Sequence, residues 1–342
     1  MFENDSDYSQ YVGGGGTDYV EPHVVAIKNS VNVYYKGLSM PEKISKYLTI
    51  EALEDGLEFD YDNNSCYLQY SYDEKTWTSY VKGQYPILNT GEKIYLKGSF
   101  VPGQNRYGVG YMNIENKKFN VSGNIMSLLF GDEAEGKTDL TGYDNCFDCL
   151  FYETPLVDAS KLLLPATILA PYCYQSLFCA CDYLIGIPEL PATTLAEGCY
   201  CDMFDCCTSL TTVPELPATT LDEDCYDCMF LSCTSLTAAP ELPATTLAKD
   251  CYAWMFEDCS SLTTAPELPA TTLAEDCYYS MFNGCSNLNY IKMLATDISA
   301  NNCLNSWVDG VSSTGTFVKN AAATWNVTGV NGIPEGWTVE TV

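Results

Sequence analysis

Basic residues are scarce in this 342-residue chain. It has 16 Lys and Arg against 45 Asp and Glu, a net charge of -29, and a single histidine, His23. A chain of this charge is repelled by phosphate backbones, so no nucleic-acid partner is expected. No apolar run approaches the ~18 residues of a membrane span, and the polar start has no apolar core of a secretory signal. We therefore expect no membrane insertion, and folding in a cytoplasm.

Groups for catalysis are equally few. With one histidine, no Ser-His-Asp or Cys-His set can be assembled. The run Gly13–Gly16 lacks the Lys and Ser/Thr of a phosphate loop. Acidic residues recur as copies of one surface position, whereas glycoside cleavage needs two carboxylates in a cleft. We expect no enzyme, no cofactor and no metal site, and a carbohydrate-active enzyme is the alternative left open.

The chain is rich in repetition instead. The phrase LPATTL recurs, with one variant, at a fixed spacing of 26 residues, beginning at Leu164, Leu190, Leu216, Leu242 and Leu268. Fixed periods of 20–29 residues with recurring leucines are typical of leucine-rich solenoids. A single coil of this length cannot enclose its own apolar side chains, so stacking of successive coils must bury them.

Each repeat contains a segment of the form CYxxMFxxC, as in Cys199–Cys207. Its apolar residues lie at helical spacing, which predicts a short helix. Pro188 and Pro191 forbid helix before it, and the preceding LTT segment is the expected strand. Residues 137–311 are thus predicted to form an α/β leucine-rich-repeat solenoid, with residues 312–342 as its C-terminal cap.

Twelve of the 18 cysteines fall in two columns of the repeat. The first comprises Cys146, Cys173, Cys199, Cys225, Cys251, Cys277 and Cys303, and the second Cys181, Cys207, Cys233, Cys259 and Cys285. A buried cysteine behaves as a small hydrophobe, so we expect structural thiols in the core. Metal or redox chemistry at the two CxxC pairs is the alternative.

The N-terminal region has a different pattern. Residues 1–20 are acidic and contain four consecutive glycines, which predicts a flexible attachment segment. Residues 21–45 alternate around Lys28–Ser30, as a hairpin connector does. Residues 46–130 show short alternating segments with turn residues every 8–12 positions, which predicts an Ig-like β-sandwich. The expected fold is therefore a mainly β N-terminal sandwich followed by the α/β solenoid.

Two sets of strings carry a family resemblance. MFNGCSNL and MFEDCSSLT are similar to the core of BspA-type leucine-rich-repeat surface proteins, although the 26-residue period is longer than that family's unit. LPATT repeats of this kind resemble those encoded by gut Bacteroidetes and by phages that infect them. The string YSYDEKTWTSY resembles modules that precede such repeats in phage fibre proteins. The resemblance implies a fibre or decoration protein.

A tyrosine column is the candidate binding site. Tyr174, Tyr200, Tyr226, Tyr252 and Tyr278 occupy one position of successive coils, with Trp254 and Tyr279 nearby. Stacked rings could form a platform for sugar rings or a protein partner; the alternative is that they pack along the solenoid and cover its core. The residues following each tyrosine vary while the frame does not. An exposed column of Glu189, Glu215, Glu241 and Glu267 must be solvated, paired or bound to cations.

Three hypotheses follow. The first is a phage virion protein that contacts other virion proteins through its N-terminal segment and binds a host protein or glycan through its repeats, with a homo-oligomer left open. It would be assembled in the host cytoplasm and displayed on the virion surface. The second is a BspA-like bacterial cell-surface adhesin, and the third is a carbohydrate-active enzyme.

Overall fold

The computed structural model describes residues 25–27, 30–32, 44–62, 66–100 and 108–342. The chain divides into two compact units, Met1–Lys43 and Ile44–Val342. In the first unit, β1 (Val25–Ile27) pairs antiparallel with β2 (Ser30–Asn32), within residues 21–45. The predicted attachment segment, residues 1–20, lies outside the described residues.

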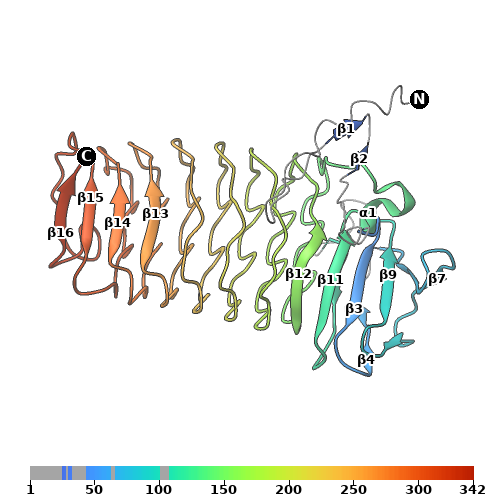
Figure 1. Cartoon of the computed structure of the whole chain (residues 1–342). Coiled ribbons are helices and arrows are strands. Elements are labelled where there is room, and N and C mark those ends of the chain that lie inside the picture. The colour runs from blue at the N-terminus through green and yellow to red at the C-terminus, as the bar shows by residue number, and fades with distance from the viewer. Residues whose placement is uncertain (1–24, 28–29, 33–43, 63–65, 101–107) are drawn as a thin grey trace, which may run out of the picture. The chain divides into compact units, whose positions relative to one another are not determined.

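The second unit begins with a six-stranded sheet in the order β12-β11-β3-β9-β6-β7 (Figure 1). Its strands are β3 (Leu48–Ala52), β6 (Gln69–Ser71), β7 (Thr78–Ser79), β9 (Lys93–Lys97), β11 (Phe119–Asn124) and β12 (Leu156–Leu163). Alternating side chains of β3 and β9, such as Ile50, Ile94 and Leu96, are fully buried beneath the sheet. The short helix α1 (Ser127–Phe130) and the 3-10 turn η2 (Gly131–Glu133) follow β11.

The predicted Ig-like β-sandwich over residues 46–130 is wrong. Besides the large sheet, the described residues of this region form two strand pairs: β4 (Leu57–Glu58) with β8 (Ile87–Leu88), and β5 (Tyr61–Asp62) with β10 (Tyr111–Met112). These short pairs do not make a second facing sheet. The strand β11 pairs antiparallel with β3 on one side and parallel with β12 on the other. Consequently the sheet extends edgewise into the repeats.

The repeats stack one after another from β12 to the end of the chain, as the row of coils in Figure 1 shows. At the far end, four parallel strands pair in sequence: β13 (Thr264–Leu268), β14 (Tyr290–Met293), β15 (Thr316–Lys319) and β16 (Thr338–Thr341). The strand β13 covers the TAPEL part of its repeat, so it begins at the last residue of the LTT segment from which a strand was predicted. In the predicted cap, β15 and β16 continue the same parallel pairing.

The predicted helix in each repeat is also wrong, so the α/β class is corrected to a mostly β chain. In Cys199–Cys207 every second amide donates to the next coil: the N–H of Tyr200 to the carbonyl of Cys225 (3.1 Å), and that of Phe204 to Met229 (3.0 Å). A helix would need those donors for bonds four residues back. The intervening amides instead donate to carbonyls three residues back and so close β-turns, as from Cys207 to Phe204 (3.1 Å).

Backbone conformation explains why these turns replace a helix. Every fourth residue of the segment has a positive φ, as at Gly198 (54°), Asp202 (54°) and Cys206 (57°). Each such residue interrupts the right-handed helical conformation. Glycine, Asp and Asn, which tolerate this region best, hold most of the first positions of the series: Asn145, Gly198, Asp224, Asp250, Asp276 and Asn302.

The core of the stack consists of columns of identical side chains. The phenylalanine column stacks ring on ring with centroids 5.4–5.7 Å apart: Phe151, Phe178, Phe204, Phe230, Phe256 and Phe282. All twelve column cysteines are buried, as predicted, and none is disulfide-bonded. Several of their thiols donate to backbone carbonyls of neighbouring coils, for example that of Cys233 to Phe204 at 3.1 Å. The repeated thiols therefore belong to the frame of the stack.

Candidate functional site

The tyrosine column lies inside the stack and not on its surface. Tyr174, Tyr200, Tyr226, Tyr252 and Tyr278 are each 1% exposed, and successive rings stack with centroids 5.8–6.1 Å apart. Phe147 and Trp307 continue the column at its two ends. The platform of exposed rings is therefore wrong for these five residues, because the side chain after each of these cysteines of the first column is buried in the core of the stack.

Burial also affects the hydroxyl groups of this column. The hydroxyls of Tyr174 and Tyr252 are buried with no hydrogen-bond partner. Burial raises the pKa of all five phenols well above its usual value. These tyrosines thus act as core aromatics, and a ligand at the surface would not reach their rings.

Trp254 and Tyr279 are the two predicted site residues that are only half-buried. They come from adjacent repeats, and their ring centroids lie 4.7 Å apart at an interplanar angle of 50°. Trp254 has a φ of 51°. The equivalent residues of the neighbouring repeats, Cys228 and Ser280, also have a positive φ (53° and 48°), so this conformation belongs to the frame of the repeat. The pair forms an aromatic patch on the flank of the stack.

This patch belongs to the face formed by the two residues that follow each tyrosine of the column, which we call the variable face. Seven of its ten members between Gln175 and Ser280 are half-buried, and the other three, Cys201, Ala253 and Ser280, are buried. The face has two chemical parts. Cys and Asp occupy it at residues 201–202 and 227–228, and the aromatic patch follows one repeat later.

The glutamate column is exposed, as the sequence predicts: Glu189, Glu215, Glu241 and Glu267. Glu267 accepts a hydrogen bond from Lys292 of the next coil at 2.8 Å. A second acidic column is paired in the same way. Glu197 accepts a bond from the hydroxyl of Tyr172 (2.7 Å), and Glu223 from Lys249 (2.7 Å). Contacts between adjacent coils therefore offset part of the repulsion within each column.

In the described part of the chain, one group of carboxylates is close enough to hold a cation. Oxygens of Glu223, Asp224 and Asp250 lie within 4.8 Å of one another. The ammonium of Lys249 lies 2.7 Å from Glu223 and 2.8 Å from Asp250, and these bonds raise its pKa. Burial, with the nearby Asp250 second, raises the pKa of Asp224. The lysine already supplies the positive charge that this group needs. Sequence spacing did not single out this group, because its acids come from two repeats.

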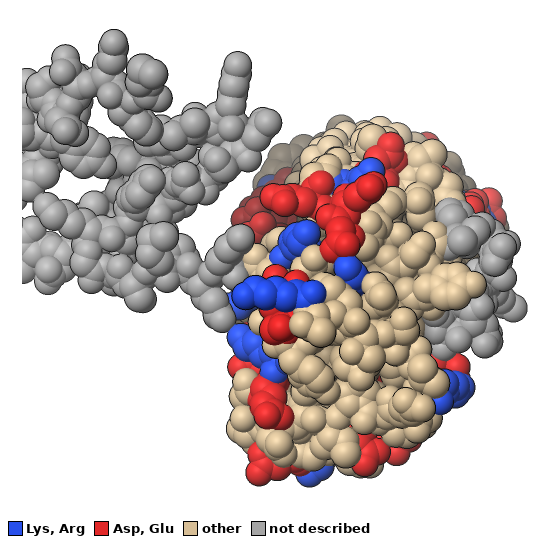
Figure 2. Space-filling view, turned by 90° about the vertical axis from the view of Figure 1, so that its right-hand side faces the viewer, with Lys and Arg blue, Asp and Glu red and all other residues tan. Residues whose placement is uncertain are grey.

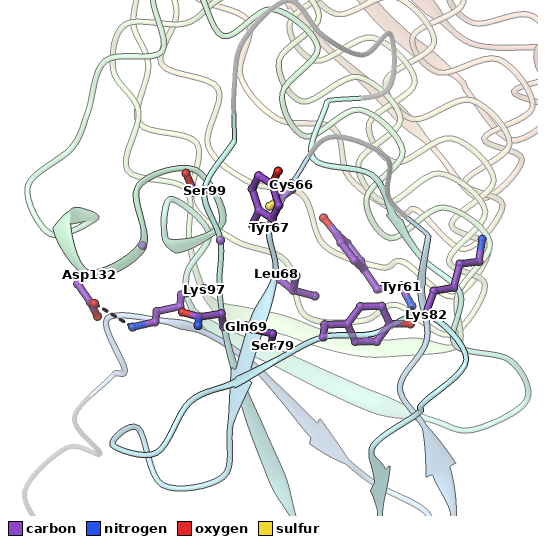
Figure 3. A pocket seen from close by; sticks show the side chains of 13 residues that line it. Tyr61, Cys66, Tyr67, Leu68, Gln69, Ser79, Lys82, Lys97, Ser99 and Asp132 are labelled. Carbon is purple, nitrogen blue, oxygen red and sulfur yellow. Dashed lines mark hydrogen bonds and ion pairs between the residues drawn. The ribbon is translucent and has the colours of Figure 1, made fainter.

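A separate cavity of about 410 Å³ lies in the N-terminal part of the unit (Figure 3). Tyr61 and Lys82 line one end of it, and Lys97 and Asp132 the other. The ammonium of Lys97 donates to Asp132 at 2.8 Å and lies 4.2 Å from the centre of the Trp77 ring. Among the described residues that line this cavity, Asp132 is the one carboxylate. The described lining thus holds one acid, whereas glycoside cleavage uses a pair.

Charge is distributed unevenly along the unit. Figure 2 shows the end that carries β7 and β9, where basic and acidic side chains are interspersed along one side beside a wide uncharged area. Residues 137–311 contain 24 Asp and Glu against four Lys, a net charge of -20. The repeats therefore repel polyanions more strongly than the N-terminal part does.

Among the residues that the structure describes, none of the helices has the length and apolar character needed to cross a bilayer. Comparison of the chain with protein-family models, with curated proteins and with solved structures finds no match.

Proposed function

We propose that the chain is a non-enzymatic structural protein of a phage particle, a fibre or decoration, whose stacked repeats attach to a protein or glycan of the host cell. The resemblance of its LPATT repeats to those of phages and their hosts supports the setting. The observation that carries the attachment role is the contrast between a constant buried frame and the variable face beside it. A stack places each position at a regular interval, so single changes on this face alter recognition without altering the fold.

Trp254 and Tyr279, which form the aromatic patch, are the residues proposed to contact the host protein or glycan. Large rings with a polar edge suit stacking against sugars or protein side chains. With a net charge of -20 over residues 137–311, the stack selects against polyanionic ligands. Neutral glycans and uncharged or basic protein surfaces are the expected partners.

Attachment to the particle is assigned to residues 1–20, with the hairpin as connector. In this proposal the protein is assembled in the host cytoplasm and displayed on the virion surface. The BspA-like adhesin is the second candidate, because the repeat strings resemble that family as well.

Electron microscopy with gold-labelled antibody against the chain separates the two candidates. The phage proposal predicts gold on purified particles and none on the envelope of uninfected cells. Gold on the envelope of uninfected cells, with bare particles, would establish the adhesin instead. A chain that lacks residues 1–20 should fold with an unchanged melting temperature and be absent from particles.

A further inference from the structure

Three open hollows adjoin one another where the N-terminal sheet region meets the first coils of the stack. Their volumes are about 430, 350 and 430 Å³. Glu153 and Thr154 line both the first and the second hollow. The third shares Asn113 with the first and Asn116 with the second. The hollows therefore belong to one groove, which we call the junction groove.

Four exposed tyrosines line the junction groove. Tyr111 and Tyr152 line its first hollow, and they are 43% and 42% exposed. Tyr183 lines the second hollow and is 48% exposed, and Tyr85 lines the third and is 40% exposed. Each hollow therefore offers at least one aromatic ring, which gives a ligand a large contact area beside a polar hydroxyl.

Two of these rings depart from the pattern of the repeats. The position of Tyr183 holds serine in the next three repeats and asparagine in the fourth: Ser209, Ser235, Ser261 and Asn287. Tyr152 follows Phe151 of the phenylalanine column, and the later residues at its position are all non-aromatic: Cys179, Asp205, Leu231, Glu257 and Asn283. The later coils stack without a ring at either position. The frame of the stack therefore does not explain these two tyrosines, whereas their place beside the junction groove does.

Polar neighbours hold two of the rings in place. The hydroxyl of Tyr111 donates to Asp62 at 3.1 Å. The ammonium of Lys118 lies 4.2 Å from the centre of the Tyr183 ring, a contact that attracts the cation to the ring face. Side chains that are ordered before binding lose less conformational freedom when a ligand arrives. These rings are therefore suited to act as fixed surfaces for stacking.

The polar lining of the groove contains both donors and acceptors of hydrogen bonds. Asn113 and Asn116 supply carboxamides, and six acidic side chains stand against Lys117 and Lys118 among the described lining residues, a net charge of -4. Hydroxyl groups both donate and accept, so a sugar can bond to every one of these side-chain types. An acidic polymer would be repelled by the net charge, and a basic peptide would meet the two lysines. A neutral, hydroxyl-rich ligand fits this lining best.

We propose that the junction groove binds a neutral polysaccharide, with Tyr152 and Tyr183 as the rings on which its sugar faces stack. Adjoining hollows of similar size suit a linear chain of similar units. The groove involves neither Trp254 nor Tyr279, so this site is independent of the proposed attachment function.

Affinity electrophoresis of the full chain tests this site. Native gels contain mannan, arabinoxylan, β-glucan or galactan, and the retardation relative to a gel without polysaccharide gives the affinity. We expect at least one of these neutral polymers to retard the wild type. Tyr152→Asn combined with Tyr183→Ser introduces residues that later repeats carry at the same positions, so this groove variant should fold. Because it removes both stacking rings, it should lose about tenfold in affinity.

Two control variants locate the binding, with circular dichroism confirming that each protein folds. Tyr72→Ser removes a tyrosine that is 56% exposed outside the groove, and it should bind as the wild type does. Trp254→Asn combined with Tyr279→Ser should also bind normally, which separates this test from that of the attachment function. If the groove variant does not fold, Tyr183→Ser alone should lose about threefold in affinity.

Three outcomes would overturn the site. The first is a wild type that none of the four polysaccharides retards. The second is equal retardation of the wild type and of whichever groove variant folds. The third is retardation by polylysine alone that the groove variant loses, because the groove would then take a basic protein segment.

Discussion

Replacement of Phe230 by alanine tests the stacked core at its centre. Phe230 is fully buried and stacks on Phe204 at 5.6 Å and on Phe256 at 5.7 Å, so the change removes a ring from both neighbours. Truncation of a buried phenylalanine costs about 3–5 kcal/mol, and each aromatic contact contributes about 0.5–1.5 kcal/mol of specific interaction. Against a total stability of roughly 5–15 kcal/mol, the loss is large.

Urea unfolding followed by circular dichroism measures this loss, with Thr237→Ala as the matched control. Thr237 is exposed in the same repeat, so its change should alter the free energy of unfolding by less than about 0.5 kcal/mol. We expect Phe230→Ala to lower it by at least about 3 kcal/mol. A loss within about 1 kcal/mol of the control would refute a core built from stacked identical rings.

Three further predictions follow from buried polar groups. Tyr252→Phe should leave the melting temperature unchanged or raise it, because the buried hydroxyl has no hydrogen-bond partner. An unsatisfied buried group of this kind costs about 1–3 kcal/mol. A clear drop in melting temperature would mean that the hydroxyl is hydrogen-bonded. In the folded protein the pKa of Asp227 is about 7, raised from 3.8, so the folded state binds this proton more tightly than the unfolded state does. The free energy of unfolding should therefore fall as pH rises from about 4 to about 7. Asp227→Asn should flatten that decline, and an identical pH profile in both proteins would contradict the raised pKa. The twelve column cysteines should resist a thiol reagent until denaturant is added, because all are buried; rapid native labelling of most of them would exclude their place in the core.

The period of the repeat and the residues of its core were predictable from the sequence, because the five copies in register share one set of apolar positions. The local conformation was not. Apolar spacing in Cys199–Cys207 favours a helix when a coil is considered alone, but amides such as those of Tyr200 and Phe204 bond to the next coil. A Gly, Asp or Asn recurs before the cysteine of the first column, as at Gly198 and Asp224, and this residue marks the turns in the sequence.

The prediction of exposed contact residues failed for the same reason, because the sequence does not show which groups of one coil contact the next. A tyrosine after each column cysteine can face solvent or the next coil, and its period is the same in both cases. In the structure it faces the core, so of the seven predicted contact residues Trp254 and Tyr279 alone are only half-buried. The sandwich was misassigned because the short alternating segments of residues 46–130 are compatible with one extended sheet or with two facing ones.

The most direct test of the attachment role is binding of the labelled full chain to host cells. We compare the wild type with Trp254→Asn combined with Tyr279→Ser, because asparagine tolerates the left-handed backbone at residue 254 and should preserve the fold. Thr237→Ala is the control on an exposed position outside the aromatic patch. The account predicts that the double variant melts normally and loses at least tenfold in cell binding, while the control binds as the wild type does. Undiminished binding by a folded double variant would contradict the assignment of recognition to this patch.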